Sequence, residues 1–245
     1  MFIKVNRFRT GVYKIITYKC FQLLYTQKNN MDISPKAKQL FLAIGAALGW
    51  FAIVFQFYLI IINKTASISE TIIRFFSFFT ILTNILVALC FTFLLFKPGS
   101  KWGKFFTRPS TQTALTAYIT VVGIIYNIIL RFLWSPQGLQ LIVDELLHTV
   151  IPIWFILYWF IFVPKETLKW NILPWLIYPV IYCIYTLIRG AIFGFYPYPF
   201  IDVNALGYTK VLINILGLVI VFFVVSLLLV GIAKLIKRAP GNKDE

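Results

Sequence analysis

Histidine, acidic residues and cysteine are scarce in this chain. Its 245 residues include one histidine, eight acidic residues and three cysteines, and charged residues make up only 13% of the total. A zinc site usually draws its ligands from several His and Cys side chains, so we expect neither a metal nor a cofactor. No two cysteines form a C-x-x-C pair, and we therefore expect free thiols.

Apolar residues are correspondingly abundant, at 60% of the chain, against about 45–50% in an ordinary soluble domain. Six apolar runs are each long enough to cross a bilayer as a helix, which takes about 20 residues. These runs cover residues 39–62, 71–96, 113–134, 141–163, 171–195 and 210–233. The predicted fold class is all-α: a polytopic membrane protein built as a six-transmembrane-helix bundle.

Basic residues indicate the orientation of this bundle. The net charge is +15, and lysine and arginine gather at both termini and in the loops after the second and fourth runs. The positive-inside rule then places both termini in the cytoplasm of a multi-pass protein of the cell membrane. We predict a basic cytoplasmic segment (1–37), a transmembrane domain (38–236) and a cytoplasmic tail (237–245). The charge indicates contact with anionic membrane lipids rather than nucleic acid.

Polar residues inside the apolar runs recur at one depth, near the expected outer ends. In the second run the spacing of three and four residues through Glu70, Arg74, Ser77, Thr80 and Asn84 predicts one face of one helix. Ionisable groups at such depth usually face a bundle interior or a wet cavity. We expect a polar cavity in the outer half of the bundle. The expected substrate-binding residues are Arg74, Asn84, Asn127, Arg131, Arg189 and Asp202.

His148 is the only candidate general base with a pKa near neutrality. A nucleophilic mechanism also needs a hydroxyl and a group that orients the base. Thr80 lies at a depth compatible with His148 and is the preferred nucleophile. Thr83 lies nearly a turn deeper and remains an alternative nucleophile. Asp144 precedes His148 by four residues on the same helix face and is expected to orient the base. The simpler alternative is that the threonine bonds its own helix and that the histidine makes a structural hydrogen bond.

Three motifs resemble those of the androgen-induced-gene/FAR-17a family of six-span membrane proteins. They are Phe78-Phe79-Thr80-Ile81-Leu82-Thr83-Asn84, His148-Thr149-Val150-Ile151-Pro152 and Tyr198-Pro199-Phe200-Ile201-Asp202, and the resemblance covers roughly residues 40–235. Animal members of that family are threonine hydrolases that cleave fatty acid esters of hydroxy fatty acids. The resemblance implies His148 as base and Thr80 or Thr83 as nucleophile. In the second motif this chain has one residue fewer before Pro152 than the family has, so its substrate need not be the same as theirs.

Two functions follow as hypotheses. The first is an intramembrane lipid-ester hydrolase, in which substrate enters from the outer leaflet and Asn84, Asn127 or Arg131 stabilises the oxyanion. The alternative is a lipid-binding or small-solute transport protein without hydrolase activity. Against transport, the sequence shows neither an inverted repeat nor a pair of interrupted helices. The expected partners are membrane lipids and, for the hydrolase, a lipid-ester substrate.

Overall fold

A computed structural model describes residues 34–133 and 135–238, and within them all regular structure is helical. Six helical segments are long and apolar enough to span a membrane, as expected. These segments cover Pro35–Ile62, Phe79–Phe96, Pro109–Phe132, Gly138–Phe162, Leu173–Phe193 and Val203–Ile236. The predicted segments 1–37 and 237–245 fall largely outside the described residues. The chain is therefore an all-α membrane bundle.

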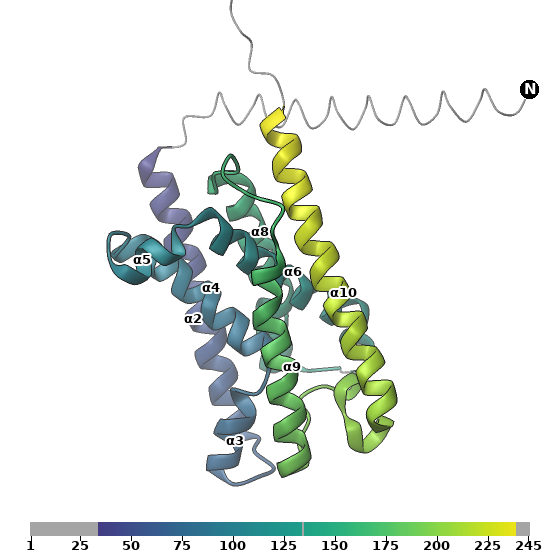
Figure 1. Cartoon of the computed structure of the whole chain (residues 1–245). Coiled ribbons are helices and arrows are strands. Elements are labelled where there is room, and N and C mark those ends of the chain that lie inside the picture. The colour runs from purple at the N-terminus through teal and green to yellow at the C-terminus, as the bar shows by residue number, and fades with distance from the viewer. Residues whose placement is uncertain (1–33, 134, 239–245) are drawn as a thin grey trace, which may run out of the picture.

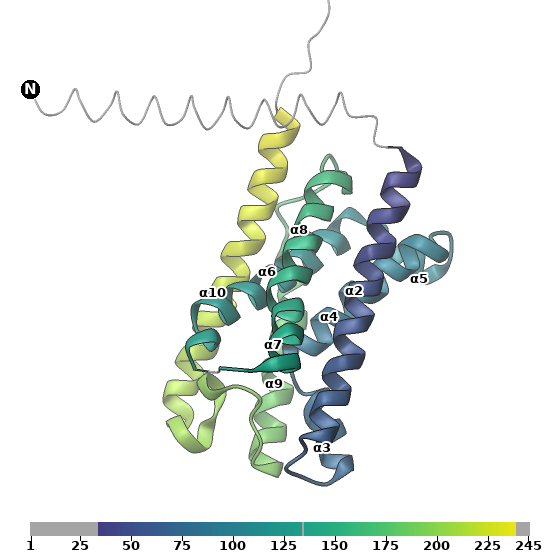
Figure 2. The same ribbon diagram turned by 180° about the vertical axis from the view of Figure 1, so that it is seen from behind.

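The helices run up and down, so that successive connections alternate between the two ends of the bundle. Helix α2 (Pro35–Ile62) begins, and helix α10 (Val203–Arg238) ends, at the same end, while α3 (Ile68–Phe75) and the end of α9 (Leu173–Phe193) lie at the other (Figure 1). Seen from behind, α2 and α10 lie on either side of α6 (Pro109–Ile128), α8 (Ile151–Phe162) and α9, and α5 (Lys101–Phe106) projects beyond α2 (Figure 2). The two described ends of the chain thus lie on the same side of the bundle.

Small residues allow the closest helix pair, α2 against α4 (Phe79–Phe96). A Cβ added at Gly49 would lie 2.9 Å from the Cβ of Ala88, and one added at Gly45 would meet the ring of Phe91 at 2.7 Å. Without a hydrophobic force between helices in lipid, such close approach supplies the packing energy. Gly45 and Gly49 therefore fix the distance between these two spans.

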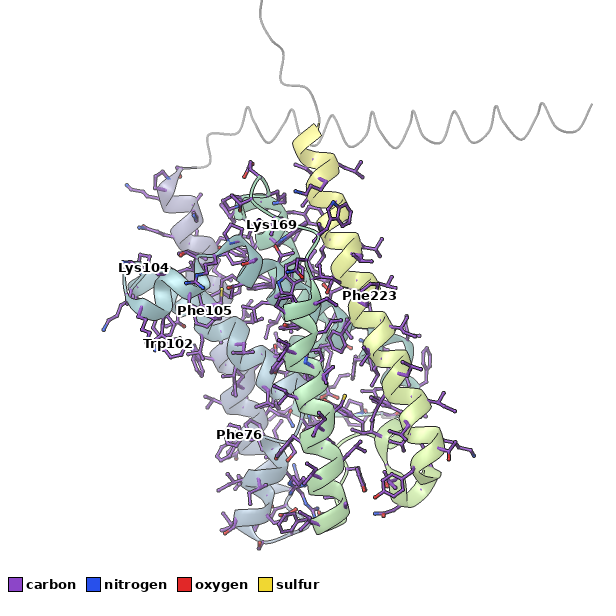
Figure 3. The ribbon with its side chains drawn as sticks, in the orientation of Figure 1. Phe76, Trp102, Lys104, Phe105, Lys169 and Phe223 are labelled. Atoms are coloured by element: carbon purple, nitrogen blue, oxygen red, sulfur yellow. The ribbon has the colours of Figure 1, made fainter. Side chains whose placement is uncertain are left out.

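Basic side chains mark the end of the bundle where α2 begins and α10 ends. The short helix α5 (Lys101–Phe106) lies there, with Trp102 exposed beside its lysines, and Lys104 and Lys169 sit toward that same end (Figure 3). Tryptophan and lysine are enriched at membrane–water interfaces. Lys165 differs, because it is buried and its Nζ donates to the carbonyls of Trp159 and Val163 at the end of α8 (Ile151–Phe162).

The prediction of one continuous helix over 71–96 is wrong. Helix α3 ends at Phe75, Phe78 is extended, and α4 starts at Phe79. Glu70 and Arg74 are therefore on a different helix from Thr80 and Asn84, and the four do not form one helical face. No proline or glycine marks this break; it is held by side chains from α9 and from the loop that follows it, described below.

The fourth span is also irregular, although it continues through 138–162. A π-helical turn, η2 (Leu146–Val150), joins α7 (Gly138–Glu145) to α8. The N–H of Ile151 donates to the carbonyl of Leu146, five residues back, as a π-helix requires. His148 lies inside this turn.

The remaining elements are α6 (Pro109–Ile128) and the short helices η1 (Leu130–Phe132) and η3 (Pro199–Ile201).

Candidate functional site

Hydrogen bonds and ion pairs do not join the nine predicted site residues into one network. Hydrogen bonds and ion pairs arrange eight of them in three groups, and the ninth, Asp202, caps a helix. The first group holds Thr80 and Asn84; the second Asn127, Arg131, Asp144 and His148; the third Arg74 and Arg189. Asn84 connects the first group to the second. The spans meet as predicted, but their polar groups do not converge on one point.

Thr80 lies on the wall of a cavity between α4, α6, α9 and α10. The cavity measures about 60 Å³ and its lining is mainly apolar. Of the nine predicted residues, Thr80 alone belongs to this lining. The polar side chains beside it are Tyr182 and Tyr198. This cavity is therefore apolar, with hydroxyl groups among its lining residues; the polar cavity lined by the other eight residues stays a prediction.

Tyrosine hydroxyls complete the broken second span at this wall. Phe78 provides no side-chain cap for α4, yet the first N–H groups of a helix need acceptors. The N–H of Phe79 donates to the hydroxyl of Tyr182 (3.2 Å), which in turn donates to the carbonyl of Ser77 (2.8 Å). The N–H of Thr80 donates to the hydroxyl of Tyr198 at 3.2 Å. The helix start is therefore satisfied inside the bundle, where water is excluded.

The orientation of His148 comes from backbone and aromatic contacts. Its Nδ1 lies 2.9 Å from the backbone carbonyl of Asp144. A carbonyl oxygen can only accept, so Nδ1 carries the proton and Nε2 of the neutral ring keeps its lone pair. The ring stacks on Tyr126 with centroids 4.0 Å apart. The carboxylate of Asp144, predicted to orient the base, accepts hydrogen bonds from Gln140 (3.3 Å) and Tyr126 (3.4 Å).

Two asparagines satisfy carbonyl groups of the π-helical turn. Pro152 has no N–H to donate to the carbonyl of His148, four residues back, or to that of Leu147, five residues back. Asn84 donates to the Leu147 carbonyl (3.2 Å) and to that of Thr80 (2.9 Å). Asn127 donates to the His148 carbonyl (3.4 Å) and to that of Gly123 (2.9 Å). Both N–H atoms of each amide are thereby used, which counts against either asparagine as an oxyanion donor.

Gly123 permits α6 to approach this turn. A Cβ at that position would lie 3.2 Å from the carbonyl oxygen of His148 and 3.4 Å from Cβ of Pro152. Such a contact is tight for a backbone atom, which cannot rotate away. A glycine in the third span is thus a structural part of the histidine site that the sequence pattern did not reveal.

Arg131 closes the histidine group toward the end of the bundle opposite the basic loops. Its Nη2 lies 2.5 Å from Glu145 and its Nε donates to Oδ1 of Asn127 at 3.0 Å. Its guanidinium also lies 5.2 Å from the centroid of Tyr126. These contacts stiffen the surroundings of the histidine ring without touching Nε2.

Glu70, Arg74 and Arg189 form an ion-pair group of their own. Oε1 of Glu70 lies 2.8 Å from Nε of Arg74 and 2.8 Å from Nη2 of Arg189. The hydrogen bond from Arg74, joined by that from Arg189, holds the pKa of Glu70 below its ordinary value. Arg189 is 5% exposed, so this carboxylate is the buried cation's counter-ion. The group joins α3 to α9 across the break in the second span.

Asp202 caps helix α10. Its Oδ1 accepts from the backbone N–H groups of Asn204 (2.9 Å) and Ala205 (3.3 Å). Aspartate is one of the preferred N-cap residues because its carboxylate accepts from the first free backbone N–H groups of a helix. Any contact of Asp202 with a substrate stays a prediction.

Thr80 and His148 are neighbours through Asn84 rather than partners of one another. The hydroxyl of Thr80 lies 3.3 Å from that of Tyr198, whereas His148 contacts Asp144 and Tyr126. The sequence argument gave no site role to Tyr198, although the third motif contains it, nor to Tyr182 and Tyr126; the hydroxyl or ring of each contacts the predicted groups. Within 34–133 and 135–238, no group of three or more His, Cys, Asp or Glu side chains is placed to hold a metal.

Comparisons of the chain with protein families, with curated proteins and with solved structures find no match.

Proposed function

We propose that this integral membrane protein is an intramembrane lipid-ester hydrolase, with Thr80 as nucleophile and His148 as general base. The observation that carries the proposal is the place of Thr80: a hydroxyl on the wall of an apolar cavity inside a membrane bundle. Apolar walls suit an acyl chain, and ligand sites typically combine such walls with a few polar groups.

In the proposed reaction, Oγ1 of Thr80 attacks the ester carbonyl carbon while its proton passes to Nε2 of His148. The tetrahedral intermediate then collapses, and the alcohol leaves with that proton. Water attacks the acyl-threonine ester, His148 takes the proton from the water, and the proton returns to Oγ1 as the acid departs. Nε2 carries the lone pair that this sequence of steps needs, because Nδ1 donates to Asp144.

The proposal requires a water molecule or a local movement between the two residues. The amide of Asn84 joins the backbone carbonyl of Thr80 to that of Leu147, next to His148 in sequence. Catalytic hydrogen bonds are often long or absent without substrate and tighten once it binds.

The test is covalent labelling of the purified protein in nanodiscs by a long-chain fluorophosphonate, with hydrolysis of a fluorogenic oleate ester measured in parallel. We expect labelling at Thr80, its loss in Thr80→Ala, and hydrolysis reduced about 10²–10⁴-fold in His148→Ala. Thr92→Ala is the control, since Thr92 bonds its own helix at Ala88. Absence of both labelling and hydrolysis in the wild-type protein would overturn the proposal.

A second candidate is a lipid-binding protein without hydrolase activity. It is favoured by the separation of Thr80 from His148 and by the contact of Thr80 with Tyr198. Under this function, nanodisc-reconstituted protein would retain an intact ester, seen by mass spectrometry of the co-purified lipid, and Thr80→Ala would leave the ester intact as well.

A further inference from the structure

The cavity carries a pair of hydroxyl groups on an otherwise apolar wall. Oγ1 of Thr80 and the hydroxyl of Tyr198 lie 3.3 Å apart. Most of the surrounding side chains have no polar atom that could bind a ligand. They include Val121, Val122, Ile125, Leu130, Leu218 and Phe222. A ligand with a single polar group in a long apolar body would fit such a wall.

The hydroxyls of Thr80 and Tyr198 have two protons between them, one of which is used in their mutual hydrogen bond. Tyr198 also accepts the N–H of Thr80. The third hydroxyl at this wall, that of Tyr182, already accepts from Phe79 and donates to Ser77. The other O–H of the pair has the hydroxyl of Tyr182 as a neighbouring acceptor, so a ligand carbonyl at this wall would compete with Tyr182 for that proton.

Either hydroxyl of the pair can donate to the other; the arrangement that frees the phenol O–H of Tyr198, the more acidic of the two, is the one in which Thr80 donates. In that arrangement Thr80 donates to Tyr198 in the resting protein, and during the proposed attack the Thr80 proton turns to Nε2 of His148 instead. The phenol then directs its proton to the ligand. Burial raises the pKa of Tyr198, so the hydroxyl keeps that proton at neutral pH.

The ring of Tyr198 is held in place for this task. It stacks on Phe200 with centroids 5.2 Å apart and an angle of 4° between the planes, and meets Phe78 edge-on at 5.7 Å. Donors that are fixed before the ligand arrives cost little reorganisation when charge develops on the acceptor. Tyr198 thus has a hydroxyl at the wall and a ring that cannot easily turn away.

We infer that the cavity, at about 60 Å³, takes the carbonyl end of a long-chain lipid compound whose alkyl chain extends out of it, and that the hydroxyl of Tyr198 donates a hydrogen bond to the carbonyl oxygen. The inference rests on the proposed function, because it supplies the oxyanion donor that Asn84 and Asn127 cannot provide. It also assigns a ligand class, an ester or ketone with an alkyl chain, that does not depend on whether turnover follows.

The experiment uses a ketone, which cannot be hydrolysed. A long-chain methyl ketone with ¹³C at the carbonyl is added to the full chain in nanodiscs, and the isotope-edited infrared band of the bound carbonyl is recorded. The variants are Tyr198→Phe, Thr80→Ala and, as matched control, Tyr185→Phe. Tyr185 is also a tyrosine of the same region whose hydroxyl contacts Ser77, but it does not line the cavity.

In the wild type and in Tyr185→Phe we expect the carbonyl band of the bound ketone at lower frequency than in alkane solvent. In Tyr198→Phe the band should return to the alkane position and binding should weaken about 5- to 10-fold, the usual range for one hydrogen bond. A shift that persists in Tyr198→Phe but vanishes in Thr80→Ala would make Thr80 the donor and overturn the inference. So would a wild-type protein that binds no ketone. A retained shift with no ester hydrolysis would remove the hydrolase proposal alone.

Discussion

The side-chain amide of Asn127 donates to the backbone carbonyl of His148, across the interface of the third and fourth spans. That carbonyl is one for which Pro152 supplies no N–H. A helix break in a membrane normally needs such compensation from a neighbouring helix. The histidine therefore occupies a turn whose irregular backbone is held by side chains, and the fixed turn in turn sets the position of the imidazole.

Because Asn84 replaces a hydrogen bond that Pro152 cannot make, the effects of Asn84→Ala and Pro152→Ala on the free energy of unfolding should not be additive. Asn84→Ala removes the side-chain donor to the Leu147 carbonyl, and leaving a buried acceptor unpaired costs about 1–3 kcal/mol. Pro152→Ala restores a backbone N–H that can donate to the Leu147 carbonyl. In Pro152→Ala protein, Asn84→Ala should therefore destabilise less. Thermal unfolding of the four proteins in one detergent measures this; equal losses in both backgrounds would contradict the assigned role of Asn84.

Gly123→Ala should disturb the histidine turn. The added methyl carbon would lie 3.2 Å from the carbonyl oxygen of His148, so the third and fourth spans must separate. We expect lower thermal stability by about 1–3 kcal/mol, typical of overpacking. Gly217→Ala is the control, because a Cβ there meets nothing within 4 Å and helix propensity should raise stability by up to about 1 kcal/mol. Equal behaviour of the two variants would argue against close packing at Gly123.

The ion-pair group at Glu70 predicts a dependence of stability on pH. Its pKa is lowered in the folded protein, chiefly by Arg74, so the carboxylate stabilises the fold fully above its unfolded pKa of about 4.3. That contribution is lost as pH falls through the lower folded value. Melting temperatures between pH 7 and pH 3 should fall less steeply for Glu70→Gln than for wild type. Parallel curves for the two proteins would show that the group contributes nothing.

The sequence predicted what depends on composition and length, and missed what depends on contacts between spans. Six apolar runs give six helices because lipid leaves the backbone no other partner. The break after Phe75 could not be predicted, because no proline or glycine marks it and its capping groups, Tyr182 and Tyr198, are about 100 residues away. Pro152 was a visible signal for the irregular fourth span. Its consequence, amide donors from Asn84 and Asn127, needed the packing.

Orientation in the membrane stays a prediction that labelling can check. The loops with Lys104 and Lys169 lie toward one end of the bundle, and we expect that end in the cytoplasm. With the three native cysteines replaced by alanine, Ser100→Cys should resist a membrane-impermeant maleimide in intact cells. Asn204→Cys, at the opposite end, should react. The reverse pattern would invert the topology and place the cavity wall at Thr80 toward the inner leaflet.

The choice between the two threonines of the second span follows from what each contacts. Thr80 lines the cavity, while Thr83 is fully buried, lies 3.4 Å from the hydroxyl of Tyr178 and does not belong to the lining. Thr80→Ala should therefore abolish turnover of a fluorogenic oleate ester, Thr80→Ser should retain part of it, and Thr83→Ala should stay within about 3-fold of wild type, since no reacting group is removed.

Residues that act as one catalytic unit are not additive. If Thr80 and His148 act together, the double variant Thr80→Ala/His148→Ala should be little slower than either single variant, with thermal unfolding used to confirm that each remains folded. Losses that multiply would mean that the two side chains act independently, with His148 stabilising the bundle through Tyr126 rather than taking a proton. Loss of activity in Thr83→Ala alone would move the nucleophile one turn along α4, away from the cavity that Tyr198 shares with Thr80.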